Sequence, residues 1–575
     1  MKILPPVSIE ARRLLPSRWD LLAAALVLGF IILFADASTS LMTPLSRIGA
    51  NAMSLDPRLL PGYAVRTAMR MLISMAVSLI FTLPYATWAA KSRRASSLLV
   101  PLLDILQSVP ILSFLSVTVV WFLSLSPGRE FGAELACIFA IFTSQAWNMA
   151  FSFYQSLRTV PEELEEAGRM LGLSAWSRFW RIEAPFATPP LIWNMMVSMS
   201  GGWFFVTVSE AISVGSTNIA LPGIGSYIAV AIAQKNMAAI VYAIIAMLVV
   251  ILIYDQLMFR PLVAWADRFR MDSEAAEAEG PESWALTVYR RSHLLDLLAT
   301  PFQRMMQWSY RWQPPSFGVR AAVPEVDSRT ANIIWYAILA VMGVYCGWRI
   351  WSFAQANLSW GDFGEAVGLG LLTMLRITVL IALASLIWTP IGVYVGLRPR
   401  LSRIVQPIAQ FLAAFPANIL FPFAVSLIVY FQLNPDVWLS PLMVLGTQWY
   451  ILFNVIAGAS VMPKELRDAG DNFGLSGFLW WKRLALPAIF PYYVTGAIAA
   501  TGGSWNASIV AEVANWGSTT LRAHGLGAYI ATAVQAGDFR RVVLGTAVMA
   551  FFVAVLNRII WQPLYWLAER KYRLM

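Results

Sequence analysis

Charged side chains are scarce in this sequence. Asp, Glu, Lys and Arg make up 13% of its 575 residues, and hydrophobic residues make up 58%. A soluble domain carries about 25% charged residues. This composition, with a mean hydropathy of +0.63, therefore excludes an ordinary soluble protein and indicates a polytopic membrane protein.

Cysteine, histidine and lysine are also rare, and each scarcity excludes a class of site. Cys137 and Cys346 lie far apart in apolar runs and suggest no disulfide framework. His293 and His524 stand alone, so we expect no metal site. None of the lysines follows a glycine, so the sequence has no G-x-x-x-x-G-K-[ST] phosphate loop. We expect no enzyme activity, no catalytic residue and no bound cofactor in this chain.

The few charges that are present sum to +10. A basic surplus suggests nucleic-acid binding, but here the positive residues are scattered in short loops between apolar segments. Arg and Lys concentrated on the cytoplasmic side of a membrane explain the surplus more simply. We therefore expect contact with membrane lipid and none with nucleic acid.

Twelve apolar stretches are long enough to cross the hydrocarbon, which takes about 20 residues. With the N-terminus inside, most short basic clusters fall on the inner side, and the opposite orientation would place nearly all of them outside. We expect both termini to be cytoplasmic and the first apolar segment to be a retained helix, not a signal peptide. The expected spans lie at about 20–36, 65–90, 98–125, 133–155, 187–213, 237–259, 331–353, 366–396, 404–431, 437–460, 489–513 and 542–562.

An internal repeat divides the chain into two copies of one unit. Pro161 and Pro463 are 463 − 161 = 302 residues apart, and the same offset relates many identical pairs downstream. Upstream the offset is 306, as for Pro110 and Pro416. An even number of spans per copy makes the repeat parallel, with a pseudo-two-fold axis along the membrane normal. We predict an all-α polytopic membrane protein of two homologous six-helix transmembrane domains, 1–262 and 331–575, joined by a cytoplasmic linker, 263–330.

The predicted linker is polar and uneven. It contains an acidic run, DSEAAEAEGPES (272–283), and then TVYRRSHLLDLLATPFQRMMQWSYRW (287–312). The second segment has basic and aromatic residues around an apolar face, which is typical of a helix on a membrane surface. A plain connector without function is the alternative.

Each copy carries a charged insert between its fourth and fifth spans. The inserts are VPEELEEAGRMLGLSAWSRFWRIEAP (160–185) and MPKELRDAGDNFGLSGFLWWKRLALP (462–487). In both, proline suits the first helical turn and acidic residues follow where the helix dipole favours them. Gly172 and Gly474 stand where a glycine would end the helix. We predict a short helix, a glycine turn and a second short helix on the cytoplasmic side. Two ordinary amphipathic connectors are the alternative, but the shared spacing argues against it.

The inserts resemble the EAA loop of ABC importer permeases. The pattern of that loop is Glu-Ala-Ala, three residues, Gly, nine residues and then Ile-x-Leu-Pro. Both spacings fit, and the departures are Gly for the second Ala in both copies, Asp for Glu in copy two, and Ala184 for Leu in copy one. The matching residues are Glu166, Ala167, Gly168, Gly172 and 182–185 in copy one, and Asp468, Ala469, Gly470, Gly474 and 484–487 in copy two.

The resemblance implies that each insert docks on a cytoplasmic ATPase subunit and transmits its closure to the membrane helices. Two inserts imply two ATPase subunits, which would carry ATP and Mg²⁺. It also implies a bacterial inner-membrane importer that receives its solute from a periplasmic or lipid-anchored binding protein. Small residues would let the ATPase approach closely, and two glutamates would pair with its basic groups. The implied coupling residues are Glu163, Glu166, Ala167, Gly168, Gly172, Glu465, Asp468, Ala469, Gly470 and Gly474.

The spans after the inserts carry the candidates for a substrate pathway. GGWFFVTVSEAISVGS (201–216) and GSWNASIVAEVANWGS (503–518) align Trp203 with Trp505 and Glu210 with Glu512. The tryptophan and the glutamate are seven residues apart and share a helix face, and an ionisable residue in a span is a functional candidate. We expect these side chains to line a shared cavity. A glutamate paired with a neighbour for structure is the alternative.

The W…E…G-x-G pattern, with LPGIGSYI (221–228) and AHGLGAYI (523–530), resembles the nitrate/sulfonate/taurine/bicarbonate branch of these permeases. That branch normally uses two identical six-helix chains. Here the copies are fused and have diverged, with Asn506 and Ser508 where copy one has Phe204 and Val206. Polar groups on one wall suit a small asymmetric anion.

Two other classes of protein fit parts of the pattern. A secondary transporter of the major-facilitator kind also has twelve helices in two repeated halves, and the matched charged inserts argue against it. A membrane scaffold without transport is the other alternative, and the polar residues at equivalent places within the spans argue against that.

Overall fold

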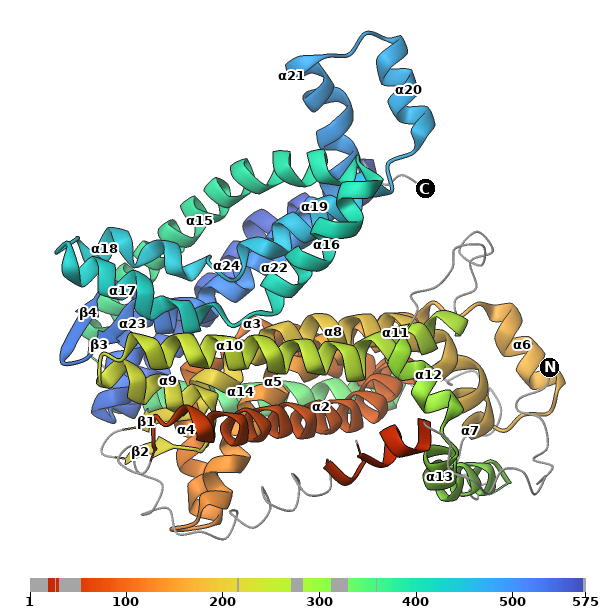
Figure 1. Cartoon of the computed structure of the whole chain (residues 1–575), viewed down its shortest axis with the longest axis horizontal. Helices are drawn as coiled ribbons and strands as arrows, with labels where there is room; N and C mark the ends of the chain where they lie inside the picture. The colour runs from red at the N-terminus through yellow and green to blue at the C-terminus, as the bar shows by residue number, and fades with distance from the viewer. Residues whose placement is uncertain are drawn as a thin grey trace.

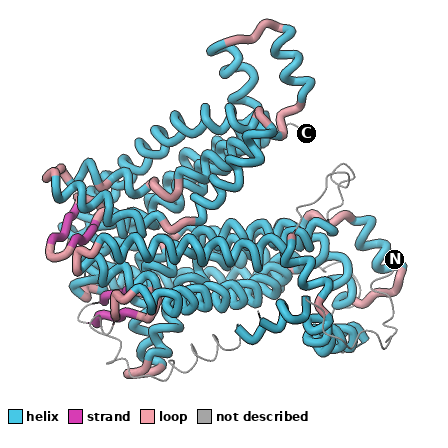
Figure 2. Tube along the Cα trace, viewed as in Figure 1, coloured by secondary structure: helices cyan, strands magenta, loops and turns pink. Residues whose placement is uncertain are grey.

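The structure is a computed structural model, and it describes residues 19–29 except 26, 53–269 except 215 and 216, 283–311, 329–357 and 359–571. Helices make up nearly all of the described chain, together with two short antiparallel β-hairpins at one end (Figure 2). The predicted all-α, polytopic class is confirmed.

The described elements of the first half run from Pro57 to Phe269. Its insert lies between α5 and α8, and its hairpin lies between α8 and α9. The elements are η4 (Pro57–Leu59), α2 (Leu60–Lys91), α3 (Arg93–Ser108), α4 (Ile111–Leu125), α5 (Glu130–Arg158), α6 (Glu162–Met170), α7 (Ala175–Arg178), η5 (Phe179–Glu183), α8 (Ala184–Ser209), β1 (Ala211–Val214), β2 (Thr217–Ala220), α9 (Ile224–Ala233), α10 (Met237–Tyr254), η6 (Asp255–Phe259), α11 (Arg260–Ala266) and η7 (Asp267–Phe269).

The second half repeats this order after the linker helices α12 (Trp284–Arg291) and α13 (His293–Arg311). Its elements are α14 (Arg329–Asn357), α15 (Trp360–Gly396), α16 (Pro399–Ala414), η9 (Ala417–Leu420), α17 (Phe421–Tyr430), α18 (Pro435–Trp438), η10 (Ser440–Met443), α19 (Gln448–Ser460), α20 (Lys464–Asn472), α21 (Gly477–Trp480), η11 (Trp481–Ala485), α22 (Leu486–Ala511), β3 (Val513–Trp516), β4 (Thr519–Arg522), α23 (Leu526–Ala536), α24 (Phe539–Leu556), η12 (Asn557–Trp561) and α25 (Gln562–Lys571).

Fewer helices than the twelve expected spans are long and straight. Within the described residues seven helices could cross a membrane, or up to nine if two bent helix pairs each count as one span. Prolines cause part of the difference, because proline removes a backbone donor and restricts the residue before it. The span expected at 98–125 breaks before Pro110, and the one at 404–431 bends by 79° around Pro416. The span expected at 20–36 lies partly outside the described residues.

Four of the described helices contain a π-helical segment, and a proline stands two residues beyond each. The segments η5 and η11 precede Pro185 and Pro487, and η6 and η12 precede Pro261 and Pro563. A π-segment shifts the hydrogen bonds by one residue, which accommodates a proline without ending the helix. As a result, α7, η5 and α8 form one helix of 35 residues from the insert into the membrane.

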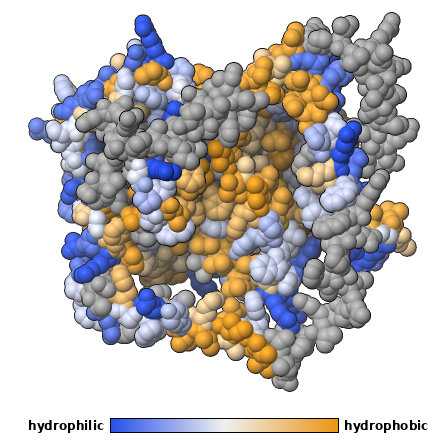
Figure 3. All heavy atoms as spheres, turned by 90° about the horizontal axis from the view of Figure 1, so that it is seen from below, coloured by the Kyte–Doolittle hydropathy of each residue, from blue (hydrophilic) through white to orange (hydrophobic). Residues whose placement is uncertain are grey.

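The two halves meet along α8, which packs against α16 with Trp193 stacked on Phe453 at 6.0 Å between ring centroids, and at the end that carries the hairpins. There α4 packs against α22 and α24, and β1 packs against α23. Figure 1 shows α15 to α25 of the second half rising away from the first half toward the opposite end, where α6 and α20 stand well separated, whereas α14 is drawn at the level of α2 and α5. Figure 3 views the molecule from below, and hydrophobic side chains gather over the middle of that face, as expected of a surface that faces lipid.

Candidate functional site

The insert helices α6 and α20 end as the sequence predicts. Pro161 precedes α6, acidic residues occupy its first turn, and Gly172 follows it with a φ of +65°. This left-handed conformation lets the Leu173 N–H donate to the Gly168 carbonyl, which closes a Schellman turn. Gly474 ends α20 in the same way, also with a φ of +65°. The predicted helix, glycine turn and second helix are confirmed in both inserts.

Gly168 and Gly470 lie on the inner side of their helices. Both are buried. A methyl group at Gly168 would press on the Ile182 side chain, and one at Gly470 would press on Leu484. These two glycines therefore let the two helices of each insert pack closely, and they do not lie on the outer surface that a partner could approach.

The outer side of each insert helix carries most of the other expected coupling residues. In α6 these are Glu163, Glu166 and Ala167, all exposed; in α20 Glu465 and Asp468 are exposed, and Ala469 is half-buried. The outer surface of each helix therefore has acidic side chains in the first turn and only a small side chain at Ala167 or Ala469.

Large apolar side chains also lie on these outer surfaces, and the prediction from the sequence did not include them. Met170 and Leu171 are 91% and 75% exposed, and Phe473, which is equivalent to Leu171, is 83% exposed. The available signal was a large apolar residue directly before the helix-ending glycine in both copies. A large apolar side chain held in the open on a rigid helix suits a surface that another protein covers.

The first insert is tied rigidly to the membrane helices. Glu183, in η5, accepts a salt bridge of 2.8 Å from Lys91 at the end of α2. The α6 helix packs against η5, and η5 continues directly into α8. A displacement of α6 is therefore transmitted to a membrane span without an intervening flexible loop.

Glu210 lies at the end of α8, fully buried. One of its oxygens accepts hydrogen bonds from the Thr67 hydroxyl and an Arg70 N–H, each at 2.7 Å. The other oxygen accepts from the Gly225 N–H at 2.7 Å. Arg70 also donates through Nε to Glu134 at 2.7 Å. Two carboxylates thus share one buried guanidinium, and hydrogen bonds satisfy the remaining lone pairs, as a buried ion pair requires.

Glu512 occupies the equivalent place in the second half with a weaker ion pair. It accepts from the Thr373 hydroxyl at 2.8 Å and from the Ala528 N–H at 2.9 Å. Arg376 approaches Glu512 only to 3.6 Å and donates instead to Asp436 at 2.9 Å. The same types of residue therefore surround both glutamates, but Arg376 is bound mainly to the second carboxylate.

The G-x-G pairs after each hairpin pack directly on these glutamates. A Cβ at Gly223 would overlap the Glu210 carboxylate, and one at Gly225 would overlap the Thr207 carbonyl. The equivalent Gly525 lies against Glu512 in the same way. The glutamate and the glycines thus recur together in both copies, because the loop that contains the glycines packs directly against the carboxylate.

Of the four pathway candidates shared by both copies, Trp203, Glu210 and Glu512 are buried inside their own halves, and Trp505 is buried at the contact between the halves. Trp203 is 2% exposed and packs edge-to-face on Tyr254 at 5.6 Å, and Trp505 is 1% exposed. Glu210 and Glu512 are each paired with neighbouring side chains, as in the structural alternative that the sequence left open. That they line a cavity stays a prediction.

The partners of these glutamates carried a sequence signal of their own. Thr67 and Arg70 recur as Thr373 and Arg376 at the 306 offset. A buried arginine that recurs with a buried glutamate is an ion-pair candidate. The third member, a carboxylate, is Glu134 in one copy and Asp436 in the other.

Hydrogen bonds between the two halves form a seam near the pseudo-two-fold axis. Asn506 accepts from the Ile111 N–H at 2.8 Å, at the start of α4. Asn418 donates to the Thr207 hydroxyl at 2.9 Å. Ser508 is fully buried and donates to a carbonyl of its own helix, so of the two polar residues expected on one wall, Asn506 alone joins the seam.

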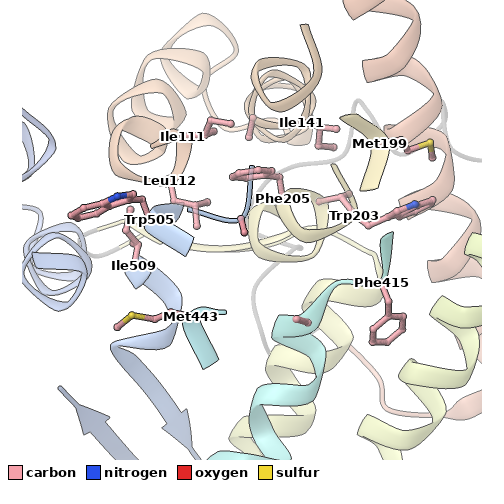
Figure 4. Packing of buried hydrophobic residues seen from close by; sticks show 14 of the residues in the cluster. Ile111, Leu112, Ile141, Met199, Trp203, Phe205, Phe415, Met443, Trp505 and Ile509 are labelled. Atoms are coloured by element: carbon pink, nitrogen blue, oxygen red, sulfur yellow. The ribbon is translucent and has the colours of Figure 1, made fainter. Parts of the chain in front are cut away.

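Apolar side chains fill the seam around these bonds. Figure 4 shows Leu112 of α4 beside Trp505 and Ile509 of α22, with Phe205 of α8 next to them. All four are at most 7% exposed. The seam is thus a packed, mainly apolar contact between the halves at this end of the molecule.

The seam does not follow the pseudo-two-fold symmetry. At the offsets of 302 and 306, the hydrogen-bonded pair of Thr207 and Asn418 corresponds to the apolar pair of Ile509 and Leu112. Asn506 likewise corresponds to Phe204. The two walls therefore differ in polarity, as the divergence of the copies predicts.

Possible metal ligands are not clustered in the described part of the chain. It holds no group of three or more His, Cys, Asp or Glu side chains placed to bind a metal ion. Cys137 is buried, and its Sγ lies 3.1 Å from the Ser209 hydroxyl. The chemistry that the structure offers is that of docking surfaces and a closed seam.

These features define a class of protein. Two copies of a helical membrane domain, each with a rigid external insert continuous with a span and with a closed seam between the copies, constitute a membrane permease. The sequence family described as binding-protein-dependent transport system inner membrane component matches the chain twice, over 82–260 and 388–570. The chain belongs to this family and is a multi-pass inner-membrane permease of an ABC importer.

Individual relatives are distant, and each match covers about a third of this chain. The bicarbonate transport system permease protein CmpB of Synechococcus elongatus is 25% identical over 206 residues, which are 36% of this chain and 69% of that protein. The glycine betaine/carnitine transport permease protein GbuB of Listeria monocytogenes is 25% identical over 33% of this chain and 63% of its own length. The nitrate import permease protein NrtB of Leptolyngbya laminosa is 24% identical over 32% of this chain and 63% of its own length.

Proposed function

We propose that this permease moves a small anion of the bicarbonate, nitrate or sulfonate type, driven by two separate ATPase subunits that dock on α6 and α20. The family supports ATP-driven import, and the named relatives include bicarbonate and nitrate permeases. The observation that carries the proposal is the pair of rigid inserts with exposed acidic and apolar side chains, because each continues without a break into a span.

The ATPase subunits would drive transport by changing the distance between the two inserts. The halves meet at the hairpin end and diverge toward α6 and α20 (Figure 1), which is the shape of a transporter open to the side of the inserts. Two ATPase subunits that close on ATP would bring α6 and α20 together. Because α7, η5 and α8 are one helix, the same motion would strain the seam at Thr207 and Asn418 and open the opposite side. In this orientation both termini and the linker are cytoplasmic, and a binding protein delivers the solute at the hairpins.

An anion fits the broken helices at the seam. The α4 helix begins at Ile111 and η9 begins at Ala417, both after a proline and both beside the axis. Discontinuous helices in transporters present their N-terminal, positive ends to anionic groups. Asn506 already uses one of these N–H groups, and its amide lies at the polar wall of the seam.

Transport in proteoliposomes tests the proposal. The chain would be reconstituted with its ATPase subunits and binding protein and offered labelled bicarbonate, nitrate, an aliphatic sulfonate and glycine betaine. ATP-dependent uptake of one of the anions is expected. Uptake of betaine alone would overturn the anion assignment while keeping the permease, and uptake driven by an ion gradient without ATP would overturn the coupling.

Replacing Asn506 tests the polar wall. We expect Asn506→Ala to impair uptake without loss of the bound ATPase, because the amide lies at the seam and far from the inserts. Ser508→Ala is the matched control, since that hydroxyl bonds within its own helix. Unchanged uptake by the Asn506 variant would remove this residue from the pathway.

A further inference from the structure

Helix α13 in the linker has an exposed apolar stripe. Leu297, Leu298, Met305 and Trp308 are 71%, 54%, 57% and 64% exposed. Together with the exposed Pro301 they recur at intervals of three and four residues, so they lie on one side of the helix.

The two other sides of α13 are accounted for. Asp296, Gln303, Arg304 and Gln307 are exposed and form a polar side that suits water. The third side faces protein, where the hydroxyl of Ser309 accepts a hydrogen bond from the Trp176 indole at 3.2 Å. Figure 1 shows α13 below α12 and α7, at the end of the molecule that carries α6.

The start of α13 is anchored as firmly as its end. Asp20, from the short apolar helix Trp19–Gly29, accepts from the Ser292 hydroxyl at 2.9 Å and from the Leu294 N–H at 3.0 Å. This carboxylate caps the N-terminus of α13. The helix is therefore held in one orientation by groups at both ends.

Aromatic and arginine contacts gather around α12 and its neighbours, at the same end of the molecule as α13. The Tyr289 hydroxyl donates to the Leu257 carbonyl at 2.8 Å, at the end of the α10 span. The Arg268 guanidinium lies 5.6 Å from the Trp265 ring, and the Arg291 guanidinium lies 6.0 Å from the ring of Trp19. Tryptophan, tyrosine and arginine gather where hydrocarbon meets headgroups.

We propose that α13 lies in the headgroup layer of the leaflet on the side of the inserts, with its apolar stripe among the lipid chains. The occupant is lipid because a helix with one side on protein, one in water and one apolar, held at the boundary, has the geometry of an interfacial helix. Arg290, Arg291 and Arg304 are placed to reach headgroup phosphates, and the acidic side chains near them include Asp296 and Asp20, which caps the helix.

The lipid contact would act on one insert only. Through Ser309, α13 holds Trp176 of the first insert beside the membrane surface. The equivalent residue of the second insert is Phe478, which has no indole N–H and is 79% exposed. The proposed lipid contact is separate from the proposed solute and from the coupling to the ATPase subunits. It relies on the proposed orientation only for naming the leaflet as cytoplasmic.

Accessibility of single spin labels tests the proposal on the full chain. In a Cys137→Ala, Cys346→Ala background, single cysteines would be placed on the stripe by Leu298→Cys and Met305→Cys. Gln303→Cys and Gln307→Cys provide matched controls on the polar side of the same helix. Each variant would be labelled with a nitroxide and studied in nanodiscs of phosphatidylcholine and phosphatidylglycerol.

Collisions with oxygen and with a water-soluble nickel complex distinguish the outcomes. Labels at 298 and 305 are expected to favour oxygen by several-fold over the nickel complex, and labels at 303 and 307 are expected to show the reverse. Nickel access at all four positions would overturn the proposal, because the stripe would then lie in water. Labels at 298 and 305 reached by neither reagent would also overturn it, because another protein surface would then cover the stripe.

Discussion

The buried carboxylates Glu210 and Glu512 differ in how closely their arginines bind them. Arg70 donates to Glu210 at 2.7 Å, whereas Arg376 approaches Glu512 only to 3.6 Å and is bound by Asp436. Both arginines have another acidic partner in their own half. The difference comes from the partner of each arginine and not from the glutamates themselves.

We expect Glu210→Gln to destabilise the protein more than Glu512→Gln. Glu210→Gln loses a charge-assisted contact of 2.7 Å to Arg70, and a hydrogen bond to a charged group contributes about 1.5–3 kcal/mol. Arg70 keeps Glu134 at 2.7 Å. Arg376 keeps Asp436 within 2.9 Å, so the second variant loses mainly one weak contact. Melting of both variants in detergent measures the difference, and equal melting temperatures would contradict it.

We expect Gly225→Ala to lower the melting temperature and the yield of folded protein. Its Cβ would overlap the Thr207 carbonyl, and this backbone atom cannot move away as a flexible side chain would. Gly201→Ala, in the adjacent helix, is the matched control, because nothing lies within 4 Å of a Cβ there. That change should be neutral or slightly stabilising, since alanine favours helix over glycine by about 1 kcal/mol. Equal behaviour of the two variants would contradict the close packing of the loop.

At the scale of elements, the π-segments make the inserts mechanically useful. Pro185 and Pro487 would end ordinary helices at the membrane entrance. The π-segments before them keep α7 and α21 continuous with α8 and α22. An element that transmits a displacement must be rigid and continuous, because a flexible joint would absorb the displacement.

We expect Leu171→Glu and Phe473→Glu to weaken the association with the ATPase subunits by about tenfold or more, which is roughly 1.4 kcal/mol. Large apolar side chains at the centre of an interface contribute most of its affinity. Val437→Glu is the matched control, since Val437 is 61% exposed and lies in α18 at the opposite end (Figure 1). Co-purification of the complex measures the effect, and full retention of the ATPase by both insert variants would exclude these side chains from the docking surface.

At the scale of the whole molecule, the two halves are alike in fold and unlike along their seam. The polar contacts across it, Thr207 with Asn418 and Asn506 with Ile111, have apolar residues at the equivalent positions. Fusing the copies in one chain allows each wall to change independently. Two identical chains could not build such a seam, because each change would appear on both walls.

We expect a disulfide across the seam to stop transport. The variant would combine Thr207→Cys and Asn418→Cys in the Cys137→Ala, Cys346→Ala background. Oxidation should abolish uptake, and a reductant should restore it, because the seam must open in each cycle. Each single cysteine is a control that should transport in both conditions. Full uptake by the oxidised, cross-linked protein would show that the passage lies elsewhere.

The sequence by itself determined the class of protein, its repeat and the form of its inserts. Composition and hydropathy require a membrane, the 302 offset requires two copies, and helix signals at Pro161 and Gly172 act within a few residues of the chain. The family followed from the spacing within those inserts. These properties are local, so a single sequence carries them.

Only the tertiary structure decided where each side chain points and what it meets. Glu210 meets Arg70 across 140 residues of chain, and Asn506 meets Ile111 across 395. Gly168 faces inward, although its spacing fits a docking surface equally well. Burial and pairing depend on how helices that are distant in the sequence pack together. The helical period of the sequence does not determine that packing. The sequence predicted the apolar face of α13, whereas only the structure shows which side of this helix faces protein and which side is exposed.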